Sequence, residues 1–213
     1  MPTHPLEKFQ YCPVCGSAQF EVNNFKSKHC AQCGFTYYGN PCSATAAFIR
    51  RSSGQRFQAL QEDSSRQRFQ ALQEDSSGQR FHALQQGQDT HDELLVAVRG
   101  KEPAKGTLDL PGGFVDMYET AEEGIIREIQ EETGLIVESP RYLFSIPNRY
   151  LYSGMIIHTL DMFFEVMVDA DVHPIADDDA ADLQWMPLDS INAADFGLHS
   201  ISQAVDRYLK KGK

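Results

Sequence analysis

Three glutamates with helical spacing are the residues in this sequence best suited to chemistry. They are Glu128, Glu131 and Glu132, in the segment GIIREIQEETGL. On a helix they fall within about 100° of arc, so one side would present three carboxylates. Like charges at these spacings repel, which costs stability unless a cation or a base lies opposite. Oxygen ligands of this kind suit hard ions, Mg²⁺ first and Mn²⁺ second. A solvated acidic face is the ordinary alternative.

Two C-x-x-C-G pairs hold four of the five cysteines. The pairs are Cys12 with Cys15 and Cys30 with Cys33. Two such pairs fourteen residues apart predict a tetrahedral Zn²⁺ site, with each glycine letting backbone amides turn toward the thiolates. Four cysteines close the coordination sphere, so we expect a structural zinc. Two buried or redox-active pairs are the alternative, but no thioredoxin-like context accompanies them. His29 is either a surface residue or a substitute ligand.

The elements that must position these groups read as a mixed sheet with flanking helices. A helix is expected over 121–133, with a capping box of Thr120 and Glu123 at its start and Gly134 at its end. A second, amphipathic helix is expected at 200–210. The expected strands are 43–50, 93–99, 141–146, 156–168 and 183–187. Without a regular βαβ rhythm, this order favours an α+β fold.

Size and charge limit the function classes. The chain has 213 residues, 41% of them hydrophobic, with a formal charge of −11 and a pI near 5.0. This acidity argues against a long nucleic acid as partner, because such surfaces need many Lys and Arg. No run of eighteen apolar residues and no signal peptide is visible, so we expect a cytoplasmic protein without a membrane partner.

Three nearly identical copies of twelve residues interrupt the chain between two expected strands. They occupy 52–63, 64–75 and 76–87, and each offers only one aromatic residue and one leucine. That is too little apolar surface to offset the entropy of ordering, so we expect a mobile loop insertion rather than a stacked solenoid. A tolerated tandem expansion is favoured over a binding role. The expected domains are a ribbon at 1–41 and a second domain at 42–213 that carries this insertion at 52–87.

The glutamate segment resembles the Nudix box, G-x5-E-x7-R-E-U-x-E-E-x-G-U with U apolar. The nine matching positions are Gly113, Glu119, Arg127, Glu128, Ile129, Glu131, Glu132, Gly134 and Leu135. From ordinary residue frequencies, a match at one start position has a probability on the order of 10⁻⁹ or less. The resemblance implies an α/β/α sandwich with a mixed sheet. It also implies Mg²⁺-dependent hydrolysis of the diphosphate linkage in a nucleotide derivative.

Roles in the site follow from the same resemblance. Glu128, Glu131 and Glu132, with the Gly112 backbone carbonyl, are expected to bind one to three Mg²⁺. Arg127 is expected to orient a neighbouring glutamate through a bidentate ion pair, and Glu119 to brace the loop ahead of the helix.

The general base is less well defined by the sequence. Glu128, or a carboxylate outside the box, would take the proton from water. The outside candidates are Glu165 and Asp182, either of which is otherwise plain surface. Leu108 stands where many family members have Trp, which leaves the substrate contacts at that position undefined.

A zinc ribbon joined to a Nudix domain resembles the NADH-pyrophosphatase-like branch of the family. By resemblance, the ribbon would assist packing and a homodimer. The branch's S-Q-P-W-P-F-P segment is absent, and SIPNRYLYSG (145–154) stands in its region. There, Tyr150 and Tyr152 are either base-stacking residues or strand-edge aromatics.

Two classes of function remain from the sequence. The first is a hydrolase of NADH, ADP-ribose or a related nucleoside diphosphate derivative. The second is a catalytically weak nucleotide sensor or a nucleic-acid-binding regulator that uses the ribbon. The intact box residues and the net acidity favour the hydrolase.

Overall fold

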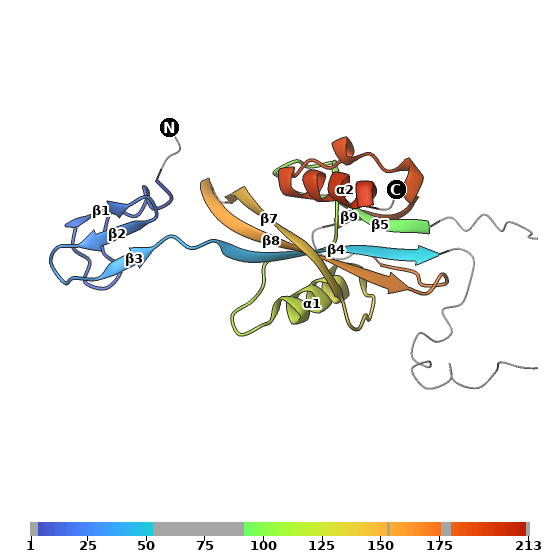
Figure 1. The fold of residues 1–213 in the computed structure, drawn as a ribbon, viewed down its shortest axis with the longest axis horizontal. Coiled ribbons are helices and arrows are strands. Elements are labelled where there is room, and N and C mark those ends of the chain that lie inside the picture. Colours follow the sequence, from blue (N-terminus) through green and yellow to red (C-terminus); the bar gives the residue numbers. More distant parts are fainter. Residues whose placement is uncertain (1–3, 53–91, 153, 176–179, 212–213) are drawn as a thin grey trace, which may run out of the picture.

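The computed structural model describes residues 4–52, 92–152, 154–175 and 180–211. It contains a small N-terminal sheet and a larger sheet with a helix on each face (Figure 1). The insertion predicted at 52–87 lies outside the described residues except for Ser52, the last residue of a strand. Among the described helices, none combines the length and the apolar character needed to cross a bilayer.

The N-terminal sheet is built from three short antiparallel strands. They are β1 (Phe20–Asn24), β2 (Ser27–Cys30) and β3 (Thr36–Tyr38), in that order. The buried residues here are Cys12, Phe20 and Cys30, with Phe9 and Phe35 packed against them. A core this small does not normally stabilise a fold by itself, which is consistent with a module stabilised by a bound metal.

The larger sheet is mixed, as the sequence predicts. Its order is β6-β5-β4-β8-β7, with β9 also pairing with β5. The pair β4 and β8 is parallel and the other pairs are antiparallel. The strands are β4 (Cys42–Ser52), β5 (Asp92–Arg99), β6 (Leu108–Asp109), β7 (Arg141–Tyr152), β8 (Met155–Val168) and β9 (Ala180–Pro187).

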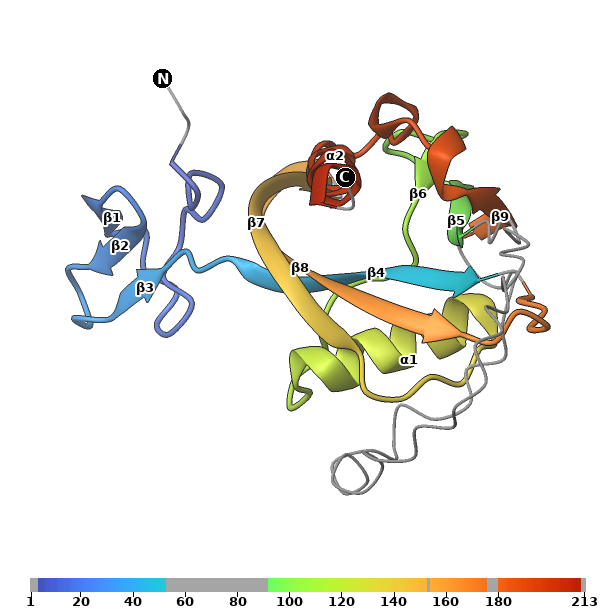
Figure 2. The same cartoon turned by 45° about the vertical axis from the view of Figure 1, so that its right-hand side comes forward.

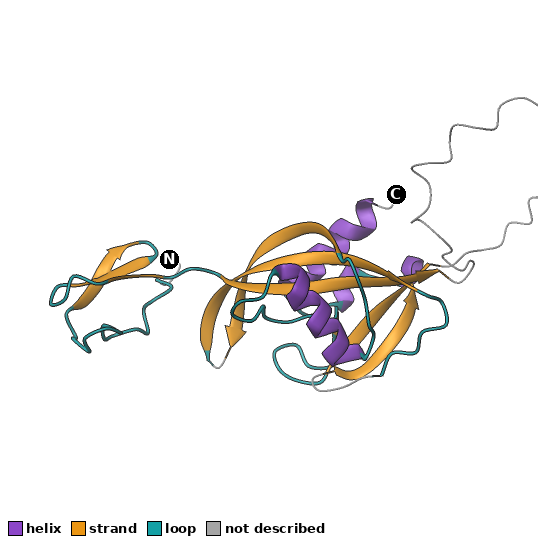
Figure 3. Cartoon of the chain, turned by 90° about the horizontal axis from the view of Figure 1, so that it is seen from below, coloured by secondary structure: helices purple, strands orange, loops and turns teal. Residues whose placement is uncertain are grey.

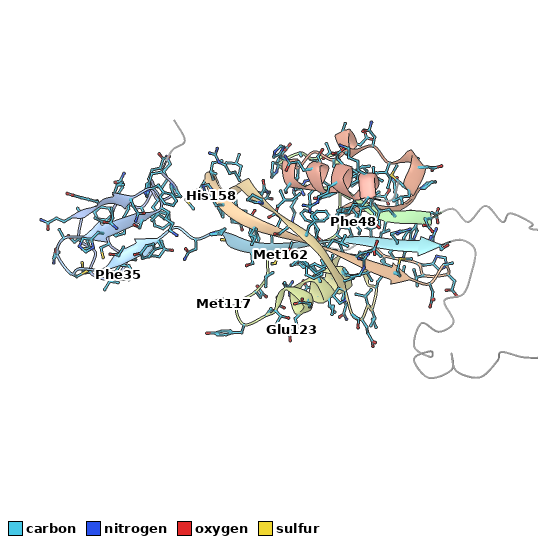
Figure 4. The ribbon with its side chains drawn as sticks, viewed as in Figure 1. Phe35, Phe48, Met117, Glu123, His158 and Met162 are labelled. Carbon is cyan, nitrogen blue, oxygen red and sulfur yellow. The ribbon has the colours of Figure 1, made fainter. Side chains whose placement is uncertain are left out.

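Each face of this sheet is covered by one helix (Figures 1 and 2). The helix α1 (Ala121–Thr133) packs Ile125 and Ile129 into one core, and α2 (His199–Lys211) packs its apolar side into the other. Strand alternation divides neighbours between the cores, since Phe164 faces α1 and Phe163 faces α2. On the α2 side, Phe48, which is labelled in Figure 4, stacks on Tyr208 at a centroid distance of 4.0 Å.

The ends of α1 follow the chemistry that the sequence predicts. The Thr120 side chain accepts from the Glu123 amide at 3.1 Å, and the Glu123 carboxylate accepts from the Thr120 amide at 2.8 Å. Gly134 adopts a left-handed φ of 69° beyond the last turn. Helix α1 therefore has fixed ends, and its glutamates have a fixed phase relative to the sheet.

The largest difference from the predicted strand bounds is at the end of β7. The strand starting at Arg141 was expected to end at Ile146, but β7 continues to Tyr152 through Pro147. Because β7 lies at the end of the strand path, a proline without an N–H is tolerated there. This extension carries Asn148, Tyr150 and Tyr152 along β8. Figure 3 shows the strands of the larger sheet from below.

Candidate active site

The glutamates of α1 face a loop that approaches the helix closely. Ile125 and Ile129 are fully buried, so helical geometry places Glu128 and Glu132 beside the buried face and Glu131 farther out. The exposed side-chain fraction accordingly rises from 14% at Glu128 to 58% at Glu131. In Figure 4, Met117 marks the loop before α1 and Glu123 its first turn.

Arg127 is the centre of the carboxylate cluster. Its Nε and Nη2 donate to the two oxygens of Glu119 at 2.8 and 3.1 Å. Its Nη1 donates to Glu128 at 2.8 Å and to Glu131 at 2.9 Å. Its Nη2 also donates to the Phe114 carbonyl at 3.0 Å. The guanidinium thus joins the loop ahead of α1 to two glutamates on the helix, and Glu119 is the carboxylate that it holds in a bidentate pair.

Two glutamates of the cluster have opposite pKa shifts. Burial raises the pKa of Glu128 above its ordinary value, although Arg127 opposes that change. Hydrogen bonds from Arg127 and the Asp116 amide lower the pKa of Glu119. The cluster therefore contains one carboxylate that is held ionised and one that takes a proton more readily.

Glu132 contacts the loop backbone directly. Its Oε2 accepts from the Gly112 amide at 2.9 Å. The Pro111 and Gly113 carbonyls accept from the amides of Ala47 and Thr45 in β4. Because successive carbonyls of an extended segment alternate in direction, the Gly112 carbonyl points away from β4.

A cavity of about 380 Å³ opens beside this cluster. Glu132, Gly112 and Gly113 lie on its wall, as do both tyrosines that the sequence singles out. Tyr150 and Tyr152 stack at a centroid distance of 6.4 Å, and each meets the Phe114 ring edge-on at 6.2 Å. Glu132 and the aromatic residues therefore lie on the wall of one cavity.

The two outside carboxylates are not part of this cavity's lining. Glu165 lies on the α2 side of the sheet, where it accepts from Tyr208, Arg50 and Arg141. Asp182 is exposed in β9, where it accepts from the Gln184 side chain at 2.9 Å. The structure thus brings the box residues together and leaves both of these carboxylates elsewhere.

Sequence reasoning missed two aspartates that do line the cavity. They are Asp109 in β6 and Asp161 in β8. Asp109 forms a salt bridge with Arg99, and burial raises its pKa. The signal for Asp161 was present in the sequence, since one carboxylate interrupts the apolar strand segment TLDMFF (159–164).

The four paired cysteines converge at the N-terminal sheet. Their sulfurs all lie within 4.8 Å of one another, with Cys12 to Cys33 at 3.7 Å and Cys15 to Cys30 at 3.6 Å. A tetrahedral zinc with Zn–S bonds of about 2.3 Å places its sulfurs about 3.8 Å apart. A hydrogen bond from the Cys33 amide is the main cause that lowers the pKa of Cys30 to about 7. The cluster is therefore compatible with zinc.

His29 does not point to this cluster. Its Nδ1 lies 2.9 Å from the Thr36 hydroxyl on the neighbouring strand. Within the described part of the chain, the cysteine set is the only group of three or more His, Cys, Asp or Glu side chains gathered this closely. The glutamate cluster is instead spread around the Arg127 guanidinium.

Comparison with known proteins adds family evidence to this geometry. Residues 81–206 match the family model of the NUDIX domain. The chain is 48% identical over 60 residues to the ADP-ribose pyrophosphatase of Methanocaldococcus jannaschii, covering 27% of this chain and 36% of that protein. It is 23% identical over 152 residues to the NAD-capped RNA hydrolase NudC of Deinococcus radiodurans, covering 71% of this chain and 41% of that protein.

The chain spans less than half the length of these curated relatives. A solved structure that covers more of it is a NUDIX hydrolase from Nitrosomonas europaea, with a TM-score of 0.61 and 17% identity. That match covers 95% of this chain and 91% of the other. At this identity the likeness concerns the fold.

Proposed function

Because the chain belongs to the Nudix family, we propose that it is a Mg²⁺-dependent pyrophosphohydrolase of a nucleoside diphosphate derivative such as ADP-ribose or NADH. The observation that carries the proposal is the position of Glu132 and Gly112, which join the glutamate cluster to the wall of a cavity large enough for part of a nucleotide. The relatives named as an ADP-ribose pyrophosphatase and a NAD-capped RNA hydrolase support the choice of substrate class.

The donor set fits a hard divalent cation. Glu128, Glu131 and Glu132 offer only oxygen atoms, and the Gly112 carbonyl turned away from β4 adds another. Gly113 has no side chain beside Glu128, so the carboxylate can lie against the loop. When bound there, Mg²⁺ would neutralise the diphosphate charge and lower the pKa of the attacking water.

Arg127 has a positioning role in this proposal. Its guanidinium fixes Glu119 on the loop and Glu128 and Glu131 on the helix, so the ligand oxygens keep their separation when the substrate arrives. Such fixed electrostatics lower the barrier because little reorganisation is needed during the reaction. Glu119 braces the loop from the other side of the same ion pair.

Glu128 is the candidate base of this chain. Its side chain is only 14% exposed and its carboxylate lies against Gly113, which lines the cavity, so it is placed to accept a proton from a water bound there. Glu165 and Asp182 are not among the residues that line the cavity, and we do not assign them this role. The rings of Tyr150 and Tyr152 are available to contact a nucleobase at the cavity wall.

The test is product analysis with purified protein. ADP-ribose, NADH, NAD⁺, diadenosine polyphosphates and nucleoside triphosphates would each be incubated with Mg²⁺, and the products resolved by chromatography and ³¹P NMR. We expect AMP release from at least one dinucleotide or from ADP-ribose, and loss of that release with EDTA. Absence of phosphorylated products from every compound would overturn the proposal.

A further inference from the structure

Three polar side chains of β7 and β8 lie on the cavity wall on the α2 side of the sheet. They are Asn148 on β7 and Thr159 and Asp161 on β8, here called the polar triad. Asn148 and Thr159 are direct cross-strand partners, and Asp161 follows two residues later on the same face. The neighbouring positions on this face, Phe144, Ile146 and Phe163, belong to the hydrophobic core. The triad is therefore a polar interruption of an apolar surface.

The hydrogen bonds of the triad are incomplete. Asp161 is 7% exposed and accepts from the Asn148 side-chain amide at 2.9 Å. Thr159 is 3% exposed, and its hydroxyl has no hydrogen-bond partner. Buried polar atoms are nearly always paired, so an unpaired hydroxyl on a cavity wall points to a group that binds there.

Asp161 also lacks a balancing charge. Across the described residues it makes no ion pair, whereas its neighbour Asp109 is paired with Arg99. A buried carboxylate without a cation is costly unless hydrogen-bond donors surround it. The Asn148 amide supplies one donor, which leaves capacity on the second carboxylate oxygen.

These features select the chemistry of the ligand. A phosphate beside the triad is disfavoured, because the Asp161 carboxylate makes no ion pair among the residues that the structure describes, whereas the cationic residues of the cavity wall, Arg99 and Lys101, come from outside the triad. A neutral group rich in N–H or O–H donors is favoured, since it would satisfy the carboxylate and the Thr159 hydroxyl together. In a nucleotide, such donors are the exocyclic amine of the base and the vicinal hydroxyls of the ribose.

We propose that Asn148, Thr159 and Asp161 are specificity-determining residues that bind hydrogen-bond donors of the nucleoside part of the substrate. This inference rests on the proposed function, and it orients the nucleotide with its nucleoside inward and its diphosphate at Glu132. The polar triad then rejects analogues that lack the donor, because their binding leaves Asp161 and Thr159 unpaired.

The test is equilibrium binding without metal, which is independent of hydrolysis. Calorimetry in EDTA would first measure AMP, GMP, CMP and UMP, and the tightest of these would be the probe. We expect Asp161→Asn to weaken its binding by about 10-fold or more, since the amide replaces an acceptor with a donor, and Thr159→Val by about 5-fold. Asp189→Asn, an exposed aspartate outside the cavity lining, is the matched control and should bind as the wild type does.

Analogues of the probe then identify the donor. One analogue lacks the exocyclic amine and another lacks the two ribose hydroxyls. The analogue without the contacted group should bind the wild type about 10-fold more weakly and bind Asp161→Asn without further loss, because the two changes remove one interaction. Full additivity for both analogues would contradict the assignment.

Thermal unfolding separates this role from a structural one. Since Asp161 and Thr159 are incompletely paired without ligand, both variants should keep or raise the melting temperature. A lowered melting temperature with unchanged binding would show that the triad serves only the fold.

Failure of all four nucleotides to bind the wild type would overturn this proposal. Nucleotide binding without any hydrolysis would overturn only the proposed function.

Discussion

Gly113 and Glu128 lie so close that a side chain on the glycine would strike the carboxylate. A Cβ built on Gly113 would stand 2.5 Å from Glu128 Oε1 and 2.6 Å from Cδ. The obstacle is the far end of a flexible side chain, so the backbone can keep its course while the carboxylate moves. The loop therefore needs a glycine at position 113, because the carboxylate of the candidate base Glu128 occupies the space of a side chain there.

Gly113→Ala should therefore reduce activity more than stability. Displacing the Glu128 carboxylate by about 1 Å is expected to lower kcat roughly 10²-fold, with a melting temperature close to that of the wild type. Gly112→Ala is the contrasting variant. Its φ of 151° is strained for other residues and its Cβ would stand 2.1 Å from the Thr45 carbonyl oxygen, so it should unfold at a clearly lower temperature. Equal losses of stability in both variants would contradict the claim that Gly113 serves activity and Gly112 serves the fold.

Cys12→Ser should remove zinc and destabilise the N-terminal module. Cys12 is buried in a small core and its sulfur belongs to the four-sulfur cluster. Metal binding to such a site contributes directly to folding. We expect about one zinc per wild-type chain by elemental analysis and much less in the variant. The matched control is Cys42→Ser, an exposed cysteine outside the cluster, which should retain zinc. Zinc-free wild-type protein after purification in zinc-containing medium would refute the ribbon.

Glu165→Gln should destabilise the packing of α2 on the sheet. Glu165 has an 11% exposed side chain and accepts from the Tyr208 hydroxyl at 2.5 Å and from Arg50 and Arg141. The variant loses the negative charge that strengthens these hydrogen bonds, but Arg50 keeps its ion pair with Asp92 and Arg141 is exposed, so we expect a loss of about 2 kcal/mol at pH 7 by urea unfolding.

The same variant has a defined pH dependence. Burial alone would raise the pKa of Glu165, but Tyr208 and Arg141 reverse that effect and lower it. A depressed folded-state pKa gives stability that is present above the unfolded value, near 4.5, and is lost as the pH falls through the folded value. The stability difference between the wild type and Glu165→Gln should accordingly shrink below about pH 4.5. A difference that stays constant down to pH 3 would contradict it.

Removal of the repeats should leave the fold in place. In the antiparallel register of β4 and β5, Ser52 is opposite Asp92, so a short hairpin loop can join them. Deleting residues 53–87 leaves the four residues 88–91 as that connector. We expect a melting temperature close to that of the full chain and a kcat/KM within a few-fold of it, because the free energy of loop closure depends only weakly on loop length. A shortened protein that folds but loses most of its kcat/KM would show that the repeats contribute to the site.

The sequence predicted the fold where local chemistry determines the structure. Helix α1 has the predicted bounds because Thr120, Glu123 and Gly134 are capping residues with recognisable spacing. The mixed sheet follows from the order of the elements. The predicted end of β7 at Ile146 was wrong. A strand can continue through Pro147 only at the edge of a sheet, and the edge position of β7 is visible only in the assembled sheet.

The site was predictable only where it lies within one segment. The box residues lie on one loop and one helix, so their spacing alone indicates that they meet. The cavity instead combines β4, β7, β8 and the start of α2, whose register depends on long-range pairing. Asp161 and Glu165 illustrate the difference, since strand alternation puts both on the α2 side but only the assembled fold shows which one lines the cavity.

The most direct test of the central claim compares Glu132→Gln with Glu122→Gln. Both residues lie on α1, but Glu132 lines the cavity and bonds the Gly112 amide, whereas Glu122 is exposed in the first turn. With the best substrate and saturating Mg²⁺, we expect Glu132→Gln to lower kcat by at least about 10²-fold with an unchanged circular dichroism spectrum. Glu122→Gln should match the wild type. If Glu132→Gln hydrolyses the substrate within a few-fold of the wild-type rate, the glutamate cluster is not the site of diphosphate hydrolysis.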